Sequence, residues 1–312
     1  MNVLDAISIG EPLVGIYGVS GKGLKAETDF RRVLGGDTSN FSLALTKLGH
    51  PTGYVTRLGT DPFGEAYLTM WQKAGVDTSQ VETDPLHPTG LYFTAASDQN
   101  HDFVYYRRGS AASYLADHDI DEEYIRNAKV LHVSGISQAI SESCQQAVLK
   151  GLEFAKHHGL LVSYDFNFRP ALWDAARARK VALHTIGEFA TIVCLTKDEI
   201  GLLGGENDYL EIARGFIKQG VGLVAVKLGD RGCHLISNNQ SILAPAYPIG
   251  VVDTVGAGDA FAAAIVAGTL ENMPPRRLAY FANLVAALTC RGTGPVQMQP
   301  QREEVNTLLK TV

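Results

Sequence analysis

The chain has 312 residues, of which 46% are hydrophobic and 19% are charged, and this composition is typical of a globular protein with a sizeable core. Its 27 Lys and Arg residues against 33 Asp and Glu residues give a formal net charge of −6. No run of basic residues forms the stripe that a nucleic acid or an acidic membrane surface would attract, so we expect neither as a partner.

The cysteines and the N-terminal residues bear on the cellular compartment. Cys144, Cys194, Cys233 and Cys290 lie far apart with no C-x-x-C pair, which argues against zinc and dithiol motifs and fits a reduced compartment. The N-terminal residues MNVLDAISIGEP lack the basic and apolar regions of a signal peptide, and no stretch approaches the roughly 20 apolar residues of a membrane span. We therefore expect a cytoplasmic protein.

Two early segments, 13–34 and 89–108, alternate polar and apolar residues around Gly, Asp and Asn. This pattern predicts antiparallel hairpins, which we expect to form one small sheet outside an α/β core. A sheet that packs through one end only leaves a face exposed, so it can serve as a lid or as the contact of a homodimer. The core is then expected to comprise residues 1–12, 35–88 and 109–312.

Beyond about residue 120, short β-branched or Leu-rich runs alternate with amphipathic segments. This alternation predicts a parallel sheet covered by helices. The predicted strands span 125–134, 160–165, 191–196 and 223–228, and the predicted helices span 141–158, 176–188 and 209–219.

The segment VVDTVGAGDAFAA, residues 251–263, contains the pattern that most strongly indicates a catalytic site. Gly256, Ala257 and Gly258 precede a small apolar helix, where successive backbone N–H groups can converge on one anion. Asp259 in the first turn would stand beside that anion, which suits a base that deprotonates a hydroxyl attacking phosphorus. The alternative is an ordinary turn followed by an acid that favours the helix dipole. Phe261 stands where a dinucleotide fingerprint needs Gly or Ala, and no P-loop motif is present.

These residues also carry a family resemblance. DTVGAGDAF at 253–261 resembles the C-terminal signature of the ribokinase-like (PfkB-type) carbohydrate kinases, and LGGDTSNFSLALTKLG at 34–49 resembles their N-terminal glycine signature. LGTDPFGE at 58–65 and KLGDRGC at 227–233 follow in the family's order, so the resemblance covers essentially the whole chain. It implies a three-layer α/β/α, Rossmann-like core with a mainly parallel sheet and a small β-sheet lid. It also implies ATP-dependent phosphoryl transfer to a sugar hydroxyl.

By this resemblance, Asp259 takes the position of the general base, and the N–H groups of Gly256, Ala257 and Gly258 form the anion hole. The family commonly has an N-x-x-E motif that organises Mg²⁺ near the phosphates. Here Thr196 replaces the Asn and Glu199 keeps the acid. A T-x-x-E pair also caps helices, and Glu199 can do both.

The resemblance also implies positions for the nucleotide and for a monovalent cation. Lys227 replaces a Thr common in the family and either faces a phosphate or is a solvated lysine at a strand end. Many members bind a monovalent cation such as K⁺, here near Asp253 and Val255. The full set of expected nucleotide contacts is Thr196, Lys227, Gly229, Gly232, Gly256, Gly258 and Asn283.

Substrate contacts are expected at two places. Gly35, Gly36, Asp37 and Asn40 form the turn after the first hairpin; they either hydrogen-bond sugar hydroxyls, as in the family, or simply end the hairpin. Alternation along a strand places Tyr105 and Arg107 on one face.

A second arginine lies in a loop that follows a predicted strand. Arg169 is expected at the carboxyl edge of the sheet, where ligands bind in open α/β folds. Two arginines that converge from distant segments suit a carboxylate, which guanidinium groups bind in a bidentate manner. The alternative is that Arg107 and Arg169 make structural ion pairs.

The segments YYRRGSAA and DFNFRPALW resemble those of 2-keto-3-deoxygluconate kinases within the family, where Tyr92, Tyr105, Arg107 and Arg169 would line the sugar-acid site. This implies phosphorylation of 2-keto-3-deoxygluconate (2-dehydro-3-deoxygluconate) to its 6-phosphate with ATP and Mg²⁺. A fructokinase or ribokinase acting on a neutral sugar is the main alternative. A non-catalytic sensor on the same fold is disfavoured by the presence of Asp259, and a dinucleotide-dependent oxidoreductase by the missing fingerprint.

Overall fold

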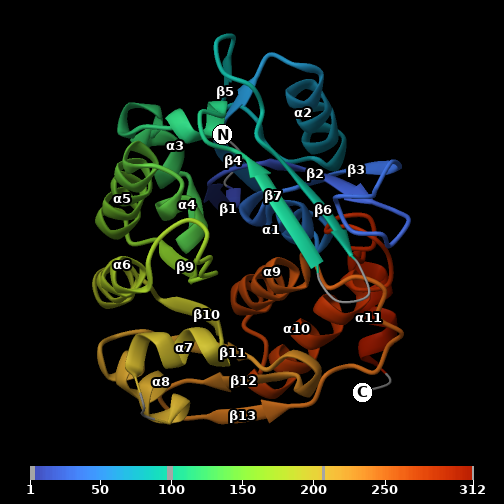
Figure 1. Cartoon of the computed structure of the whole chain (residues 1–312). Coiled ribbons are helices and arrows are strands. Elements are labelled where there is room, and N and C mark those ends of the chain that lie inside the picture. The colour runs from blue at the N-terminus through green and yellow to red at the C-terminus, as the bar shows by residue number, and fades with distance from the viewer. Residues whose placement is uncertain (1–3, 97–100, 206–207, 311–312) are drawn as a thin grey trace.

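A nine-stranded sheet forms the centre of the computed structural model, which describes residues 4–96, 101–205 and 208–310 (Figure 1). The strand order is β13-β12-β11-β10-β9-β8-β1-β4-β5, and only the β11–β12 and β12–β13 pairs are antiparallel. This confirms the predicted mainly parallel sheet. Its strands are β1 Leu4–Ile9, β4 Thr52–Gly59, β5 Val81–Asp84, β8 Ala128–Ser134, β9 Leu161–Asp165, β10 Ile192–Thr196, β11 Leu223–Lys227, β12 Cys233–Ile236 and β13 Ser241–Ala244.

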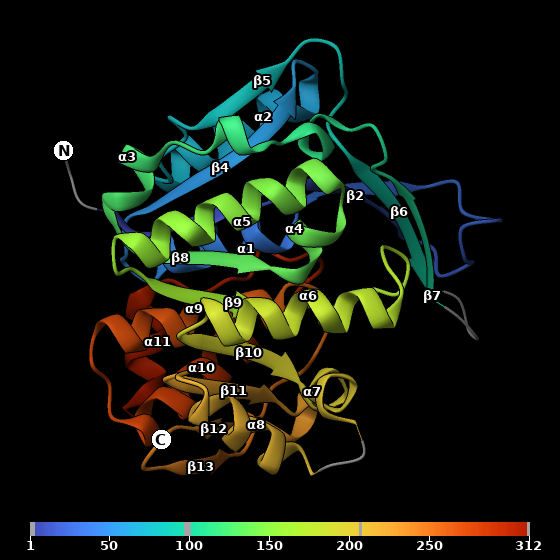
Figure 2. The same ribbon diagram turned by 90° about the vertical axis from the view of Figure 1, so that its left-hand side faces the viewer.

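Helices cover both faces of this sheet and make the three predicted layers (Figures 1 and 2). One face carries α3 Glu122–Arg126, α4 Gly135–Ala139, α5 Glu142–His157, α6 Ala175–Glu188, α7 Lys197–Gly204 and α8 Tyr209–Lys218. The other face carries α1 Asp37–Lys47, α2 Pro62–Ala74, α9 Ala257–Leu270, α10 Pro275–Thr289 and α11 Arg302–Leu309. Short 3-10 turns are η1 Ala111–Tyr114, η2 Asp117–Asp119 and η3 Gly229–Arg231.

The two hairpins form one small four-stranded sheet, as predicted. Its order is β3-β2-β6-β7. Each hairpin is antiparallel, and a parallel β2–β6 pair joins them. The bounds are β2 Leu13–Gly18, β3 Phe30–Gly35, β6 Leu91–Ala96 and β7 His101–Tyr106. Of the predicted core and lid segments, residues 1–3, 97–100, 206–207 and 311–312 lie outside the described residues.

Local signals account for most element boundaries. Ser141 caps α5 by accepting a hydrogen bond from the Cys144 N–H, as an N-cap serine commonly does. The predicted strand at 125–134 begins too early, because Asp121 caps the short helix α3 and Ile125 is buried as part of that helix. A strand and a short buried helix share the same apolar signal, so the sequence pattern did not separate them.

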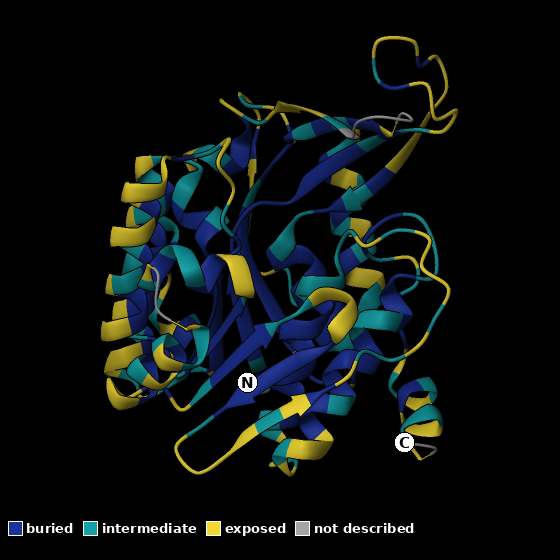
Figure 3. Cartoon of the chain, turned by 60° about the horizontal axis from the view of Figure 1, so that its bottom comes forward, coloured by how far each residue is buried: buried dark blue, intermediate teal, exposed yellow. Residues whose placement is uncertain are grey.

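The most deeply buried residues lie in the central sheet and on the helix faces that pack against it (Figure 3). The central strands are buried on both faces, and the helices expose only their outer sides. This is why the strands read as continuous apolar runs in the sequence. None of the helices formed by the described residues combines the length and the apolar character needed to cross a membrane.

Candidate active site

A cavity of about 1320 Å³ lies at the carboxyl edge of the large sheet, beside the small sheet. The ends of β9, β10 and β11, the N-terminal turns of α1 and α9, and the end of β7 all contribute to it. Open α/β sheets bind ligands at this edge. The predicted site residues that line it are Gly36, Asn40, Tyr92, Tyr105, Arg107, Arg169, Thr196, Glu199, Lys227, Gly229, Gly232, Val255, Gly256, Ala257, Gly258, Asp259 and Asn283.

The turn before α9 has the geometry of an anion hole. Gly256 is the N-cap, with φ of 82°, a left-handed conformation that favours glycine. A Cβ at Gly256 would also approach Pro295 to 2.6 Å. The N–H groups of Gly256 and Gly258 have no hydrogen-bond partner among the described residues, whereas Ala257 donates its N–H to the Thr254 carbonyl at 3.2 Å. The N–H groups of the two glycines are therefore free to bind an anion, whereas the N–H group of Ala257 is already used.

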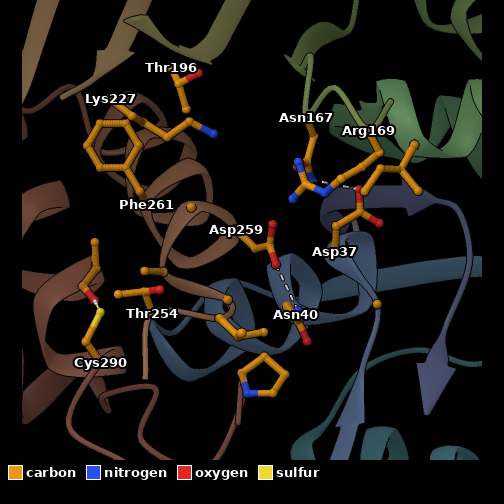
Figure 4. Close-up of a pocket in the computed structure, with 18 of the residues that line it drawn as sticks. Asp37, Asn40, Asn167, Arg169, Thr196, Lys227, Thr254, Asp259, Phe261 and Cys290 are labelled. Atoms are coloured by element: carbon orange, nitrogen blue, oxygen red, sulfur yellow. Dashed lines mark hydrogen bonds between the residues drawn. The ribbon is translucent and has the colours of Figure 1, made fainter. Parts of the chain in front are cut away.

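Asp259 stands in the first turn of α9 and is partly buried in the cavity wall. Its Oδ2 accepts a hydrogen bond of 2.8 Å from the Asn40 Nδ2 (Figure 4). Burial, with the nearby Asp37 carboxylate, raises the pKa of Asp259 to about 7. A carboxylate with this pKa is a stronger base than an ordinary Asp and is still substantially ionised near neutral pH.

Asp37, which was expected with Gly35, Gly36 and Asn40 in the turn after the first hairpin, lines the cavity. It opens α1, and its Oδ2 accepts hydrogen bonds from the Ser134 hydroxyl and, at 3.2 Å, from the Asn167 Nδ2. The signal available in the sequence was the position of Asp37 in the first turn after Gly36, whose φ of 98° places the backbone close to Glu11. Asn167 shares the loop of Arg169.

Lys227 lies at the floor of the cavity and is not a solvated lysine. Its Nζ donates to both carboxylate oxygens of Asp165, at 2.7 and 2.9 Å. A Cβ built on Gly258 would lie 3.4 Å from this Nζ, so the ammonium group lies against the anion-hole turn. Burial opposes the charge of Lys227, but the Asp165 carboxylate raises its pKa overall. Burial raises the pKa of Asp165 to about 6, although Lys227 opposes the shift.

Thr196 and Glu199 form a capping box at the start of α7. The Glu199 carboxylate accepts from the Thr196 N–H at 2.7 Å and from the Phe168 N–H at 2.8 Å. The capping alternative is therefore confirmed. Each carboxylate oxygen thus accepts one backbone hydrogen bond, and Glu199 ties the start of α7 to the loop that contains Phe168.

The two predicted arginines differ in their partners. Arg107 is buried and pairs with the Glu11 carboxylate, while its Nε has no partner among the described residues. Its guanidinium also lies 5.8 Å from the Tyr105 ring centroid, and Tyr105 in turn stacks on Tyr92. Arg169 is exposed to the cavity and donates only to the Phe168 carbonyl, at 3.0 Å. The structural ion pair is thus confirmed for Arg107, whereas Arg169 forms no ion pair with any described residue.

Two predicted residues do not line the cavity. Gly35 exchanges hydrogen bonds with the Tyr67 hydroxyl through both its N–H and its carbonyl group. The Asp253 carboxylate accepts from the Val255 and Gly294 N–H groups at 2.9 and 2.8 Å. Gly35 therefore shapes the loop without facing the cavity, and the Asp253 carboxylate is used to hold the loop before α9.

The cavity has two chemically different ends (Figure 4). Thr196, Lys227 and Phe261 lie on one side of Asp259, and Asp37, Asn167 and Arg169 lie on the other. Asn283 on α10 lines the first of these ends and donates to the Ala244 and Pro245 carbonyls. A base between these two ends can take a proton from a group bound on one side while the anion-hole turn holds an anion on the other.

Comparisons with known proteins agree with this geometry. The family model of pfkB family carbohydrate kinases matches residues 4–302. The chain is 33% identical to a 2-dehydro-3-deoxygluconokinase of Thermoproteus tenax, over 99% of this chain and 95% of the relative. It is 32% identical to fructokinase-1 of Oryza sativa subsp. japonica, over 98% of this chain and 97% of the relative. The structure of a candidate ribokinase II of E. coli in complex with ATP and Mg²⁺ superposes with a TM-score of 0.91 and 28% identity, covering 99% of this chain and 100% of that one.

Proposed function

The chain belongs to the pfkB family of carbohydrate kinases, and on that premise we propose that it transfers the γ-phosphoryl group of ATP to a hydroxyl of 2-keto-3-deoxygluconate, giving the 6-phosphate. The choice of a sugar acid as substrate rests on Arg169. This exposed cation lines the cavity and has no carboxylate partner among the described residues. A sugar acid supplies that carboxylate. The similarity to a 2-dehydro-3-deoxygluconokinase supports the same substrate.

In the proposed mechanism, the Asp259 carboxylate removes the proton of the attacking hydroxyl at its Oδ atoms. Asn40 orients that carboxylate through its hydrogen bond to Oδ2. The free N–H groups of Gly256 and Gly258, with the Lys227 ammonium, stabilise the charge on the phosphoryl group as it moves. Phosphoryl transfer depends mainly on such positioning and charge stabilisation.

The nucleotide is proposed to occupy the end of the cavity that contains Lys227. Gly229, Gly232 and Asn283 would border it there, and Thr196 would lie near the phosphates. Mg²⁺, when bound with ATP, would neutralise phosphate charge. Glu199 fits an indirect role toward Mg²⁺, since its oxygens already accept backbone hydrogen bonds. A K⁺ site near Asp253 and Val255 remains a proposal by family resemblance.

The proposed function is tested by ADP release in a coupled assay with ATP and Mg²⁺. The panel contains 2-keto-3-deoxygluconate, its galacto epimer, fructose, ribose and a control without sugar. A preference for the keto-deoxy acids supports the proposal. A preference for fructose or ribose would retain the kinase mechanism and reject the sugar acid, and no ADP release with any sugar would favour a sensor.

A neutral-sugar kinase is the second candidate function. The observation in its favour is that Glu11 already pairs with Arg107, so only one of the two predicted arginines, Arg169, has no carboxylate partner among the described residues. The similarity to a fructokinase at 32% identity supports it as well.

Arg169→Ala separates these two candidates. If Arg169 binds a substrate carboxylate, KM for the sugar acid should rise by about 10- to 100-fold, the equivalent of a charge-assisted hydrogen bond. KM for ATP should stay within about twofold, as measured by steady-state kinetics. Arg177→Ala is the matched control, because it removes an exposed arginine of α6 outside the cavity. An equal effect of Arg169→Ala on both substrates would remove Arg169 from the sugar site.

We also propose that the small sheet is a lid that joins two copies of the chain. Its outer face exposes Phe30, Val104 and Tyr106, with exposed fractions of 42%, 44% and 63%. Apolar groups gathered on an exposed sheet favour association.

The dimer is tested by light scattering after size-exclusion chromatography. Val104→Glu/Tyr106→Lys should give a monomer at concentrations where the unmodified chain is a dimer. Leu243→Glu is the control, since Leu243 is 65% exposed on β13 of the other sheet. A monomeric unmodified chain would contradict the proposal.

A further inference from the structure

Asp37 places a carboxylate in the same cavity as Asp259. We propose that Asp37 is a positioning residue whose negative charge sets the pH below which Asp259 stops acting as a base. This inference rests on the proposed role of Asp259 and adds an electrostatic role to Asp37, a residue that the family resemblance places beside the sugar hydroxyls.

Two helix N-termini bring the carboxylates to one wall. Asp37 is in the first turn of α1 and Asp259 is in the first turn of α9, and these two helices pack against each other. Asn40 lies three residues after Asp37, on the same side of α1, and its Nδ2 is hydrogen-bonded to Asp259. Figure 4 shows Asp37 and Asp259 on adjoining sides of the cavity, with Asn40 between their helices.

The hydrogen-bond partners of Asp37 do not neutralise its carboxylate. Its Oδ2 accepts only from neutral donors, the Ser134 hydroxyl and the Asn167 amide. Its Oδ1 accepts no hydrogen bond from the described part of the chain and is available to a hydroxyl of the substrate. No described cation forms an ion pair with it.

The other charged groups that line the cavity differ in their partners. Lys227 at the end of β11 would favour ionised Asp259, but it is bound to both oxygens of Asp165 at the end of β9. Glu199 on α7 accepts two backbone hydrogen bonds. At the far side of the cavity, Arg107 pairs with Glu11 and Arg169 is exposed. Asp37 is therefore a carboxylate without a paired cation among the described residues, in the first turn of a helix that packs against α9.

The charge of Asp37 affects the pKa of Asp259 in one direction only. A like charge makes ionisation of a neighbouring carboxyl group less favourable and raises its pKa. Burial is the larger contribution at Asp259, and Asp37 is the next. Removing the charge of Asp37 should therefore lower the pKa of Asp259, so that the base stays ionised to lower pH.

The pH dependence of kcat/KM for the sugar tests this, because it reports the ionisation of the free enzyme. The unmodified chain should lose activity as the pH falls through about 7, the value to which the pKa of Asp259 is raised. Asp37→Asn keeps the size of the side chain and removes its charge. The midpoint of the pH profile should therefore move down by about one pH unit or more. Asp37→Glu, which keeps the charge, should stay near the unmodified midpoint.

Ser134→Ala is the matched control for hydrogen bonding. It removes a donor to Asp37 without changing the charge, so its midpoint should not move. An unchanged midpoint in Asp37→Asn would overturn the proposal, and so would equal shifts in Asp37→Asn and Ser134→Ala.

A second readout does not depend on catalysis. The side-chain carboxyl ¹³C signal of Asp259, assigned by its loss in Asp259→Asn, can be followed against pH in the free protein. Its midpoint should fall in Asp37→Asn even if no tested sugar is a substrate. Failure of the proposed function and failure of this inference are thus distinguishable.

Discussion

Asp259→Asn is expected to lower kcat by about 10²- to 10⁴-fold, the contribution of a general base. The substitution keeps the shape of the side chain and an oxygen that can accept from Asn40, but it cannot take up the proton of a sugar hydroxyl. The affinity for ATP, measured by calorimetry, should stay within about twofold, because the nucleotide end of the cavity is untouched. Turnover within tenfold of the unmodified enzyme would reject Asp259 as the base.

Asp198→Asn controls for the simpler role of Asp259 as an acid at a helix N-terminus. Asp198 is an exposed acid in the first turn of α7, and such an acid contributes about 0.3–1 kcal/mol to stability through the helix dipole. It should cost a little stability and no turnover.

In contrast to Asp198→Asn, Asp259→Asn should not lower the free energy of unfolding at neutral pH. The fold raises the pKa of Asp259 from 3.8 to about 7, so its ionised form is less favourable in the folded state than in the unfolded one. The folded state therefore loses stability as the pH rises from about 4 to about 7. Above that range Asp259→Asn should be at least as stable as the unmodified chain in urea unfolding, and a clear loss of stability there would indicate a structural role.

Lys227→Met is expected to affect both stability and turnover. It leaves the Asp165 carboxylate buried without its partner, and breaking a buried pair in this way costs about 3–5 kcal/mol in the free energy of unfolding. It also removes a cation beside the anion-hole turn, which should lower kcat by about 10²- to 10³-fold. Urea unfolding and steady-state kinetics measure the two effects.

A double variant separates the two roles of Lys227. Lys227→Met/Asp165→Leu replaces the ion pair by apolar side chains, and such replacements are often neutral for stability. The double variant should recover most of the stability of the single one, yet it should keep the low turnover. Recovery of both would show that the ion pair acts only in folding.

Local patterns in the sequence were sufficient for the layers and for the turn before α9. The apolar runs of β9, β10 and β11 and the amphipathic runs of α5, α6 and α8 predicted a parallel sheet between helices, because each pattern reports burial within one element. The glycines around Ala257 predicted a turn at a helix N-terminus for a similar reason. Short-range geometry needs only neighbouring residues.

Pairs between distant residues could not be predicted in this way. Lys227 was left between a phosphate ligand and a solvated lysine, because Asp165 is 62 residues away and only the side-by-side ends of β9, β10 and β11 bring the two together. The sequence likewise leaves Arg107 open to either a substrate carboxylate or a structural ion pair, because its partner Glu11 lies 96 residues earlier in the chain.

The sequence by itself determined the fold class, the resemblance to a kinase family and the position of Asp259 in a glycine turn, since these depend on periodicity and local motifs. The tertiary structure decided which charges in the cavity are compensated and which are free. Burial and packing place Asp37 near Asp259, pair Lys227 with Asp165 and leave Arg169 exposed. Charge interactions act through space, and the order of residues along a chain does not contain the distances on which they depend.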